Sequence, residues 1–271
     1  MDSEVEREAR AWQVGVWDRI SGVYQSEIDR RFTPVTENVV KRAALSPGNV
    51  VLDIGTGTGA VALMAAQLVA PNGQVTGIDV SPEMLKIAEE RARSAAGGHI
   101  SFREGRAEDI PAEDAHVDVV LASLIFMYVI DRPAAARELA RVLRPGGRFV
   151  ASVWAGPDRC DIVRLQQTAG SFSPPPPVPG VGPGSLADPA PFVEQLADSG
   201  IDARVETETL GFDFEDFVSA WDALASVTTA QLSEERRQEA KNAVLAAMWP
   251  DGDGPRHFLN ETQFIVGERR G

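Results

Sequence analysis

The most constraining stretch of this sequence is VVLDIGTGTGAVALMAAQ, which runs from Val50 to Gln67. An apolar run meets an acid, glycines follow at alternate positions, and a helix-like run comes next. Glycines between a strand and a helix let backbone N–H groups approach a ligand, and the helix N-terminus favours negative charge. The stretch therefore predicts a loop that holds a nucleotide-like cofactor. Because Gly55, Gly57 and Ala60 also fit the dinucleotide fingerprint G-x-G-x-x-G/A, this loop alone leaves the cofactor open.

Strand-like and helix-like segments alternate around this loop. We expect strands near 49–54, 74–79, 99–103, 117–122 and 147–154, with helices near 58–70, 82–96 and 131–143 between them. Such alternation is typical of a doubly wound α/β sheet, in which right-handed crossovers join parallel strands. The ligand site of such a sheet lies at the carboxyl ends of the strands. Ahead of the sheet, residues 4–32 and 34–45 are predicted to be helical, the second helix starting at Pro34.

The alternation breaks after Trp154. The stretch SFSPPPPVPGVGPGS, residues 171–185, favours an extended polyproline conformation, as a stiff surface linker or as a loop bordering the substrate mouth. Beyond it, the pattern predicts a helix to about 199, strands near 203–211 and 263–268, and helices near 214–226 and 233–248. We therefore predict an N-terminal helical cap (1–45), a cofactor-binding core (46–155) and a C-terminal part (156–271) with an inserted cap at about 212–258.

Charge and cysteine content exclude several classes of function. The 271-residue chain carries a formal charge of −14, which disfavours a general nucleic-acid or anionic-membrane surface. Its single cysteine, Cys160, excludes a disulfide framework and a cysteine-cluster metal site, and we expect no metal. The charged N-terminus does not resemble a signal peptide, and the most apolar stretch, 119–130, is too short to span a bilayer. We expect a cytoplasmic protein with a small-molecule substrate, and leave a homo-oligomer open.

Three features favour S-adenosylmethionine (SAM) over NAD as the cofactor. Asp79 ends the predicted second strand, where an acid reaches ribose hydroxyls, but both cofactors contain a ribose. Asp53 precedes the first glycine, where it would repel a pyrophosphate and suit the cationic ammonium and sulfonium of SAM. Gly59 adds a third alternate glycine, and RPGGRF (144–149) forms a turn leading into the fifth strand.

With these residues in view, the segment from Trp17 to Trp154 resembles a class I SAM-dependent methyltransferase. It is similar to the ubiquinone/menaquinone-biosynthesis branch and to bacterial small-molecule tailoring methyltransferases. The resemblance rests on WDRISGVY (17–24), VLDIGTGTG (51–59), GIDVSPEML (77–85), GRAEDIP (105–111), VDVVLAS (117–123) and ELARVLRPGGRFVASVW (138–154). It implies a seven-stranded sheet of order 3-2-1-4-5-7-6 in which only the seventh strand is antiparallel.

The resemblance also implies roles for the matching residues. Gly55, Thr56 and Gly57 would hold the methionine part of SAM, and Asp53 would support that loop and face the ammonium. Asp79 would bind the ribose hydroxyls. The other implied contacts are Met84 on the adenine face, Ala107 at the adenine edge, Ser123 beside the methionyl tail and Tyr24 closing over the cofactor.

One position departs from the family pattern. Arg106 stands where the family usually has an acid, and arginine cannot accept a hydrogen bond from the adenine amino group. Either Glu108 or Asp109 takes that role, or only the backbone of Ala107 contributes.

The resemblance implies methyl transfer to a small molecule, for which alignment is the main task and is worth about 7–11 kcal/mol. Candidate catalytic residues are Tyr24 and His257, with Tyr128 a further polar candidate. An apolar or aromatic substrate, such as a secondary metabolite or a quinone-like molecule, is suggested by aromatic residues that are equally suited to form the cap's own core: Phe212, Phe214, Phe217, Trp221, Trp249 and Phe258. The alternatives are a SAM-fold protein that uses its pocket for non-methylating cyclisation or binding, and an NAD-dependent oxidoreductase.

Overall fold

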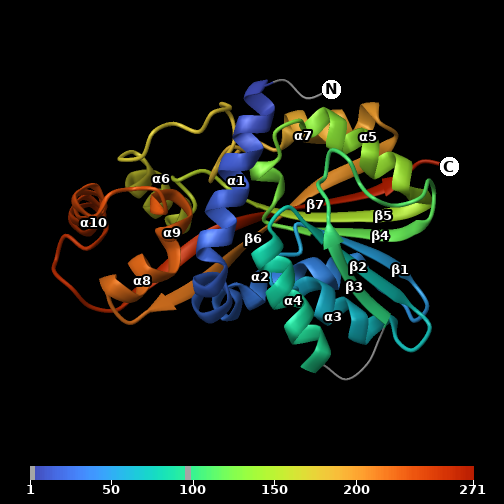
Figure 1. The fold of residues 1–271 in the computed structure, drawn as a ribbon, viewed down its shortest axis with the longest axis horizontal. Helices are drawn as coiled ribbons and strands as arrows, with labels where there is room; N and C mark the ends of the chain where they lie inside the picture. Colours follow the sequence, from blue (N-terminus) through green and yellow to red (C-terminus); the bar gives the residue numbers. More distant parts are fainter. Residues whose placement is uncertain (1–3, 95–98) are drawn as a thin grey trace.

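The computed structural model describes residues 4–94 and 99–271, which fold around one seven-stranded sheet of order β3-β2-β1-β4-β5-β7-β6 (Figure 1). Strands β1 to β5 are parallel, whereas β7 runs antiparallel to both β5 and β6. The predicted sheet order is confirmed. The strands are β1 (Val50–Ile54), β2 (Gln74–Asp79), β3 (His99–Glu104), β4 (Val117–Ser123), β5 (Leu143–Trp154), β6 (Ile201–Phe214) and β7 (Arg256–Arg269).

Helices cover both faces of this sheet, as a doubly wound fold requires. On one face lie α2 (Asp29–Ala43), α3 (Ala60–Val69) and α4 (Pro82–Ser94) (Figure 1). On the other face lie α5 (Arg132–Val142) and α7 (Ala190–Asp198). The side chain of Asp131 accepts a hydrogen bond from Ala134 N at 2.9 Å, so it caps α5.

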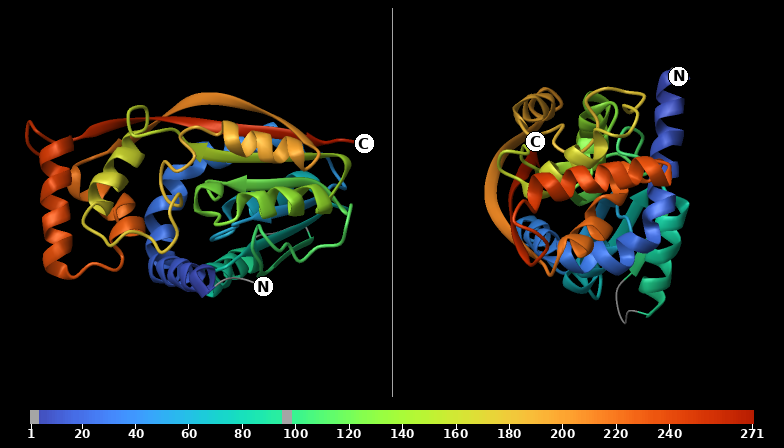
Figure 2. Two further views of the ribbon diagram at one scale, coloured as in Figure 1. Left: turned by 90° about the horizontal axis from the view of Figure 1, so that it is seen from above. Right: turned by 90° about the vertical axis from the view of Figure 1, so that its left-hand side faces the viewer.

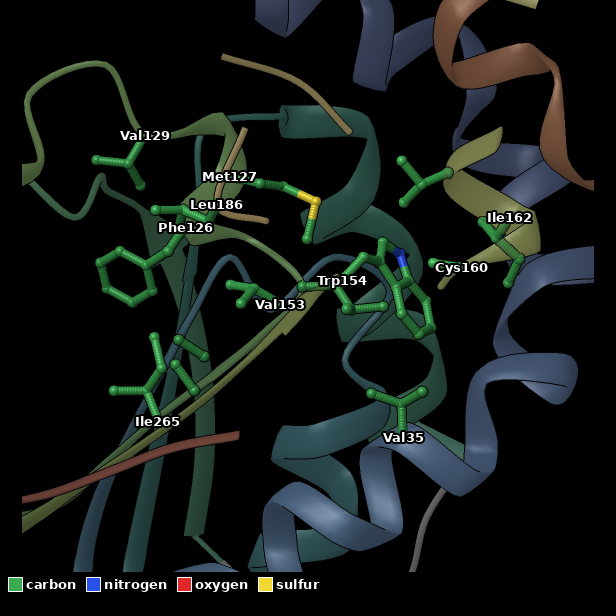
Figure 3. Packing of buried hydrophobic residues seen from close by; sticks show 14 of the residues in the cluster. Val35, Phe126, Met127, Val129, Val153, Trp154, Cys160, Ile162, Leu186 and Ile265 are labelled. Atoms are coloured by element: carbon green, nitrogen blue, oxygen red, sulfur yellow. The ribbon is translucent and has the colours of Figure 1, made fainter. Parts of the chain in front are cut away.

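Alternate residues of the central strands fill two separate cores. Val119 and Val150 pack with residues of α2 and α3, whereas their neighbours Val120 and Phe149 pack with α5 and α7. This alternation follows from the two-residue period of a strand and explains why β4 and β5 are apolar on both faces. Figure 3 shows the second core near the end of β5, where the ring of Trp154 extends toward Val35 of α2.

The N-terminal helices are continuous. A π-helical turn, η1 (Tyr24–Ile28), joins α1 (Glu4–Val23) directly to α2. The prediction that a helix starts at Pro34 was wrong, because Pro34 lies inside α2. Proline there leaves the carbonyl of residue 30 without its helical partner, and Arg30 is exposed, so water can satisfy that carbonyl.

The C-terminal strands are longer than the sequence pattern predicts. β6 and β7 pair along 14 residues each, from Ile201 opposite Arg269 to Phe214 opposite Arg256. The helices α8 (Phe217–Leu224), α9 (Ser226–Thr229) and α10 (Glu234–Met248) are inserted between these strands, at the end of the molecule opposite the C-terminus (Figure 2). Helix α6 (Asp161–Gly170) was not predicted. Within the described residues, every helix is too short or too polar to cross a membrane.

Candidate functional site

The glycine loop after β1 requires its glycines. Gly55, Gly57 and Gly59 have φ angles of 64°, 53° and 86°, in the left-handed region that side chains disfavour. At Gly55 a side chain is also excluded sterically, because a Cβ would lie 2.2 Å from the side chain of Ile125. The backbone N–H of Thr56 donates to Ile78 O at 2.9 Å, which ties the loop to β2. The loop is therefore fixed against the carboxyl ends of the strands.

A cavity of about 120 Å³ opens at this edge of the sheet. Its floor comes from the ends of β1, β2 and β4, and α1 contributes one wall through Gln13 and Trp17. The predicted residues that line it are Tyr24, Gly55, Gly57, Asp79, Met84, Ala107, Glu108 and Ser123. These residues come from six separate segments, so the fold brings most of the predicted site together.

Asp79 is held by the loop it faces. One carboxylate oxygen accepts the N–H of Gly57 at 2.8 Å, and the other accepts the N–H of Ser81 at 2.9 Å. Burial raises the pKa of Asp79, and these backbone hydrogen bonds act in the opposite direction. A carboxylate has about four acceptor sites, so the two bonds leave capacity for ligand hydroxyl groups in the cavity.

Asp53, at the end of β1, and Thr56, within the loop, are absent from the described lining of the cavity. Thr56 Oγ1 donates to Asp53 Oδ2 at 2.7 Å, while Asp53 Oδ1 has no hydrogen-bond partner among the described residues. The side chain is 1% exposed, and burial raises the pKa of Asp53 to about 7. The structure therefore supports the loop-bracing part of the Asp53 prediction, and a nearby cation would favour its charged form.

The wall opposite the loop is aromatic. The ring of Trp17 packs edge-on against Tyr128, with centroids 5.0 Å apart, and against Tyr24, with centroids 6.4 Å apart. The π turn η1 begins at Tyr24, and such turns are frequent at functional sites. Burial raises the pKa of both tyrosines, which keeps their hydroxyls protonated at neutral pH. Both are suited to donate a hydrogen bond rather than to accept a proton as a general base.

The expected adenine side of the cavity holds Met84, Arg106, Ala107 and Glu108. Met84 is buried. The carboxylate of Glu108 accepts the backbone N–H groups of residues 130 and 131, at 3.1 and 3.4 Å. Asp109 lies 3.5 Å from the guanidinium of Arg106 and does not line the described cavity. Of the alternatives for the adenine amino group, Glu108 and the Ala107 backbone are the ones at the cavity.

His257 lies away from the cavity. It is on the extended β6–β7 hairpin, where its Nδ1 is 2.7 Å from Asp213 Oδ1 and both side chains are exposed. The six aromatic residues of the predicted cap are buried and pack on one another or on Phe32 and Trp154, and none lines the described cofactor cavity. They form a local core, which was the second of the two interpretations.

Several lining residues had no predicted site role, among them Gln13, Trp17 and Ile125. Trp17 begins the WDRISGVY motif, which is the only sequence signal that points to it. Gln13 Nε2 donates to the backbone oxygen of Tyr128 at 2.7 Å, so α1 is bonded to the segment that follows β4. The residues that the structure describes contain no cluster of side chains suited to hold a metal ion.

A fixed glycine loop and a buried acid at the end of the neighbouring strand, at the edge of this mixed sheet, are typical of the Rossmann-like class of cofactor-binding folds. A family model described as a methyltransferase domain matches residues 45–168. Nocamycin O-methyltransferase of Saccharothrix syringae is 37% identical over 134 residues, covering 49% of this chain and 48% of that relative. The ubiquinone/menaquinone biosynthesis C-methyltransferase UbiE of Shewanella woodyi is 29% identical over 206 residues, covering 73% of this chain and 77% of the relative.

The solved structures agree on the fold. The YcgJ protein of Bacillus subtilis superposes with a TM-score of 0.64 at 20% identity, covering 88% of this chain and 99% of that one. Through residues 45–168 the chain matches a methyltransferase domain, and the resemblance to class I SAM-dependent methyltransferases that its motifs predicted is confirmed.

Proposed function

We propose that this protein transfers a methyl group from SAM to a small molecule. The observation that carries the proposal is the joint placement of the glycine loop and Asp79 in one cavity, with the Gly57 N–H bonded to the Asp79 carboxylate. That arrangement suits a ribose beside an amino-acid tail. A bulky pyrophosphate is disfavoured there because the buried carboxyl of Asp53 lies directly under the loop.

The chemical types of the residues in the cavity fit the parts of SAM. Asp79 would bind the ribose hydroxyls, Met84 would pack on the adenine, and the loop at Gly55 and Gly57 would hold the methionine part. Ala107 and Glu108 would meet the adenine edge. Asp53, whose Oδ1 lacks a partner among the described residues, would favour the ammonium through the loop that it braces. Ser123 and Tyr24 complete the proposed contacts.

When bound, SAM supplies a methyl group that its sulfonium already activates. The protein's share of the work is then to position the acceptor and to exclude water, for which good alignment is worth about 7–11 kcal/mol. Helix α1 and the turn η1 contribute to both tasks, since Gln13, Trp17 and Tyr24 form one wall of the cavity. With Tyr24 and Tyr128 protonated, their hydroxyls would orient a polar group of the acceptor by donating hydrogen bonds.

The acceptor is proposed to be a secondary metabolite or a quinone-like molecule. Support comes from the names of the two relatives, one an O-methyltransferase for nocamycin and the other a C-methyltransferase of ubiquinone and menaquinone biosynthesis. The protein is proposed to act in the cytoplasm.

The cofactor is tested by thermal shift with SAM, S-adenosylhomocysteine, NAD and NADP, because a ligand bound only by the native state raises its stability. We expect both adenosyl ligands to raise Tm and both dinucleotides to leave it unchanged. A rise with NAD alone would contradict the proposal. Mass spectrometry of products from candidate acceptors then separates methylation, which adds one methyl group, from a cyclisation that leaves the mass unchanged.

A further inference from the structure

We propose that the acceptor lies in a second cavity, walled by the proline-rich segment 171–185, and that it is an uncharged, largely apolar molecule with a hydrogen-bond donor. The inference rests on the proposed function and adds the location and chemical class of the acceptor.

The second cavity has a volume of about 250 Å³ and shares walls with the cofactor cavity. Gln13 and Tyr128 line both. An acceptor must approach the methyl group in line, so its site has to adjoin that of the cofactor. Of the cavities lined by described residues, this one meets that condition through two common side chains. The remaining lining residues are Trp12, Gln166, Gln167, Gly170, Ser173, Pro174, Pro176, Val181, Gly182, Pro183, Val227 and Thr228.

The proline-rich segment is fixed in place. It lies beside α6 and near α1 (Figures 1 and 2). Arg132 Nη2 donates to Gly180 O at 2.8 Å and to Ser185 Oγ at 2.9 Å, and the Gly182 N–H donates to Met127 O at 2.8 Å. The segment is thus bonded to the residue next to Tyr128, at the boundary of the two cavities.

Bonds to the helices fix the rest of the segment. Gln167 Nε2 of α6 donates to Pro183 O at 3.0 Å, and Ser173 Oγ donates to Thr228 O of α9 at 2.6 Å. A linker that only spans a surface needs no such bonds. Of the two sequence-based interpretations of residues 171–185, the structure therefore favours the loop at the substrate mouth.

The lining of this cavity carries no formal charge in the described residues, although the whole chain carries −14. Prolines, valines and Trp12 dominate it, and the remaining polar groups are amides and hydroxyls. Moving a charged group from water into such surroundings is strongly unfavourable without a partner. A sulfonated, phosphorylated or carboxylated acceptor body would find no cation there, so the cavity selects a neutral one.

Gln166 adds one polar requirement. Its side chain borders the cavity and is 4% exposed. Nε2 donates to the carbonyl of Leu224 at 3.3 Å, and because a carbonyl only accepts, this bond fixes the orientation of the amide. The other atom, Oε1, has no partner among the described residues. An unpaired buried acceptor favours a ligand with a hydroxyl or N–H, which would repay the lost hydration.

A matched pair of probes tests the inference: 2-naphthol and its 6-sulfonate, titrated calorimetrically into protein saturated with S-adenosylhomocysteine. We expect 2-naphthol to bind, and the sulfonate to bind at least about tenfold more weakly, because the sulfonate would bring an unpaired charge into an uncharged cavity. Val181→Trp fills the cavity and should weaken 2-naphthol binding by at least about tenfold. Val178→Trp, a change in the same segment at a residue outside the lining, should stay within about twofold of wild type.

The affinity for S-adenosylhomocysteine is measured in separate titrations of wild type and of both variants, and it separates the two proposals. If no variant, including wild type, binds it, the proposed function fails. A different outcome is that S-adenosylhomocysteine binds with unchanged affinity while 2-naphthol either fails to bind wild type or binds Val181→Trp as tightly as wild type. Either result rules out only the second cavity as the acceptor site. Equal affinity for the sulfonate would overturn the inferred neutrality.

Discussion

Asp79 is the residue on which the cofactor assignment depends most. Losing a charged acceptor should cost about 1.5–3 kcal/mol, so we expect Asp79→Asn to bind SAM roughly 10- to 150-fold more weakly. The new amide must also point its NH₂ at the N–H of Gly57 or Ser81, which adds to the loss. Calorimetric titration with SAM measures the effect. Asp109→Asn, an exposed change outside the described cavity, is the control, and unchanged SAM affinity in a folded Asp79→Asn would disprove the ribose role.

Asp53 should make stability depend on pH in a defined direction. Its pKa is raised from 3.8 to about 7 in the folded protein, because burial disfavours the charged form. Below pH 3.8 the group is protonated in both states, and its contribution is fully present. Between about pH 4 and pH 7 only the unfolded state loses the proton, so the folded state loses up to about 4 kcal/mol of relative stability as pH rises.

Asp53→Asn removes this titration and keeps an acceptor for Thr56. We therefore expect the stability of the variant, relative to wild type, to improve from about pH 4 to pH 7 and to level off toward pH 8. Urea unfolding of both proteins across that range is the measurement. Because Asp29 and Asp79 also have raised pKa values, the difference between the two proteins is compared rather than wild type alone. A difference that stays constant with pH would contradict the assignment.

A site residue could be predicted from the sequence where a short motif around it carries its role. Gly55, Gly57 and Asp79 stand at strand ends in motifs whose spacing carries their role, so the sequence could locate them. Gln13 reaches the cavity only because α1 packs across the sheet edge, and nothing in the residues near Gln13 encodes that contact. His257 was expected near the mouth because the pattern underestimated the length of β7, which carries this residue away on the hairpin.

Among the elements, α1 is held in place partly by polar contacts to the segments around the cofactor cavity. Ser81 Oγ, which also caps α4, donates to Asp18 Oδ1 at 2.5 Å. Where α2 begins, Asp29 Oδ2 lies 2.5 Å from both Thr58 Oγ1 of the glycine loop and Arg91 Nη1 of α4. The wall that covers the cofactor cavity is therefore linked to the loop and the helix that form the opposite side.

Asp18→Ala should loosen α1. Each lost hydrogen bond costs about 0.5–1.5 kcal/mol, so we expect faster hydrogen exchange in α1 and SAM binding that is weaker by roughly 2- to 10-fold. Hydrogen exchange read by mass spectrometry gives the first result and calorimetry the second. Glu8→Ala, an exposed change on the same helix, serves as the control. If both variants exchange alike, Asp18 does not hold the helix.

Elements of the parallel half were predictable because strong periodicity and caps coincide there. Ser81 with Pro82 marks the start of α4, and Asp131 marks that of α5. α6 was missed because it lies between the short segment after β5 and the prolines, so its ten residues resembled part of a loop. Pro34 was misinterpreted for a different reason: proline fits a first helical turn best, yet a helix interior also tolerates it where the residue four positions earlier, here Arg30, is exposed.

At the scale of the whole molecule, two segments distant in sequence would act together as a lid. The insertion α8–α10 is held on the β6–β7 hairpin, and its helices α8 and α9 contact η1 and α1. We expect residues 15–30 and 214–258 to exchange faster than the central strands and to gain protection when S-adenosylhomocysteine and 2-naphthol are both bound. Hydrogen exchange with and without the ligands tests this prediction. Equal protection of both segments in the two states would rule out a lid.

Tyr24→Phe tests the same closure through one hydroxyl. If that group donates a hydrogen bond in the closed site, its loss should lower turnover of an identified acceptor by roughly 3- to 10-fold and leave Tm within a few degrees. Tyr128→Phe is the matched change across the ring of Trp17. Full activity in Tyr24→Phe would show that its hydroxyl is dispensable.

The π turn between α1 and α2 has a geometric consequence for the orientation of α1. A π turn contains one residue more than an α turn, and in an α-helix one residue corresponds to a rotation of about 100°. The surplus residue within Tyr24–Ile28 therefore sets the angular phase of α1 relative to α2. Removing it would turn Gln13 and Trp17 away from the cofactor cavity while leaving the amphipathic pattern of each helix intact. The number of residues in the turn Tyr24–Ile28 thus determines which side of α1 faces the cofactor cavity.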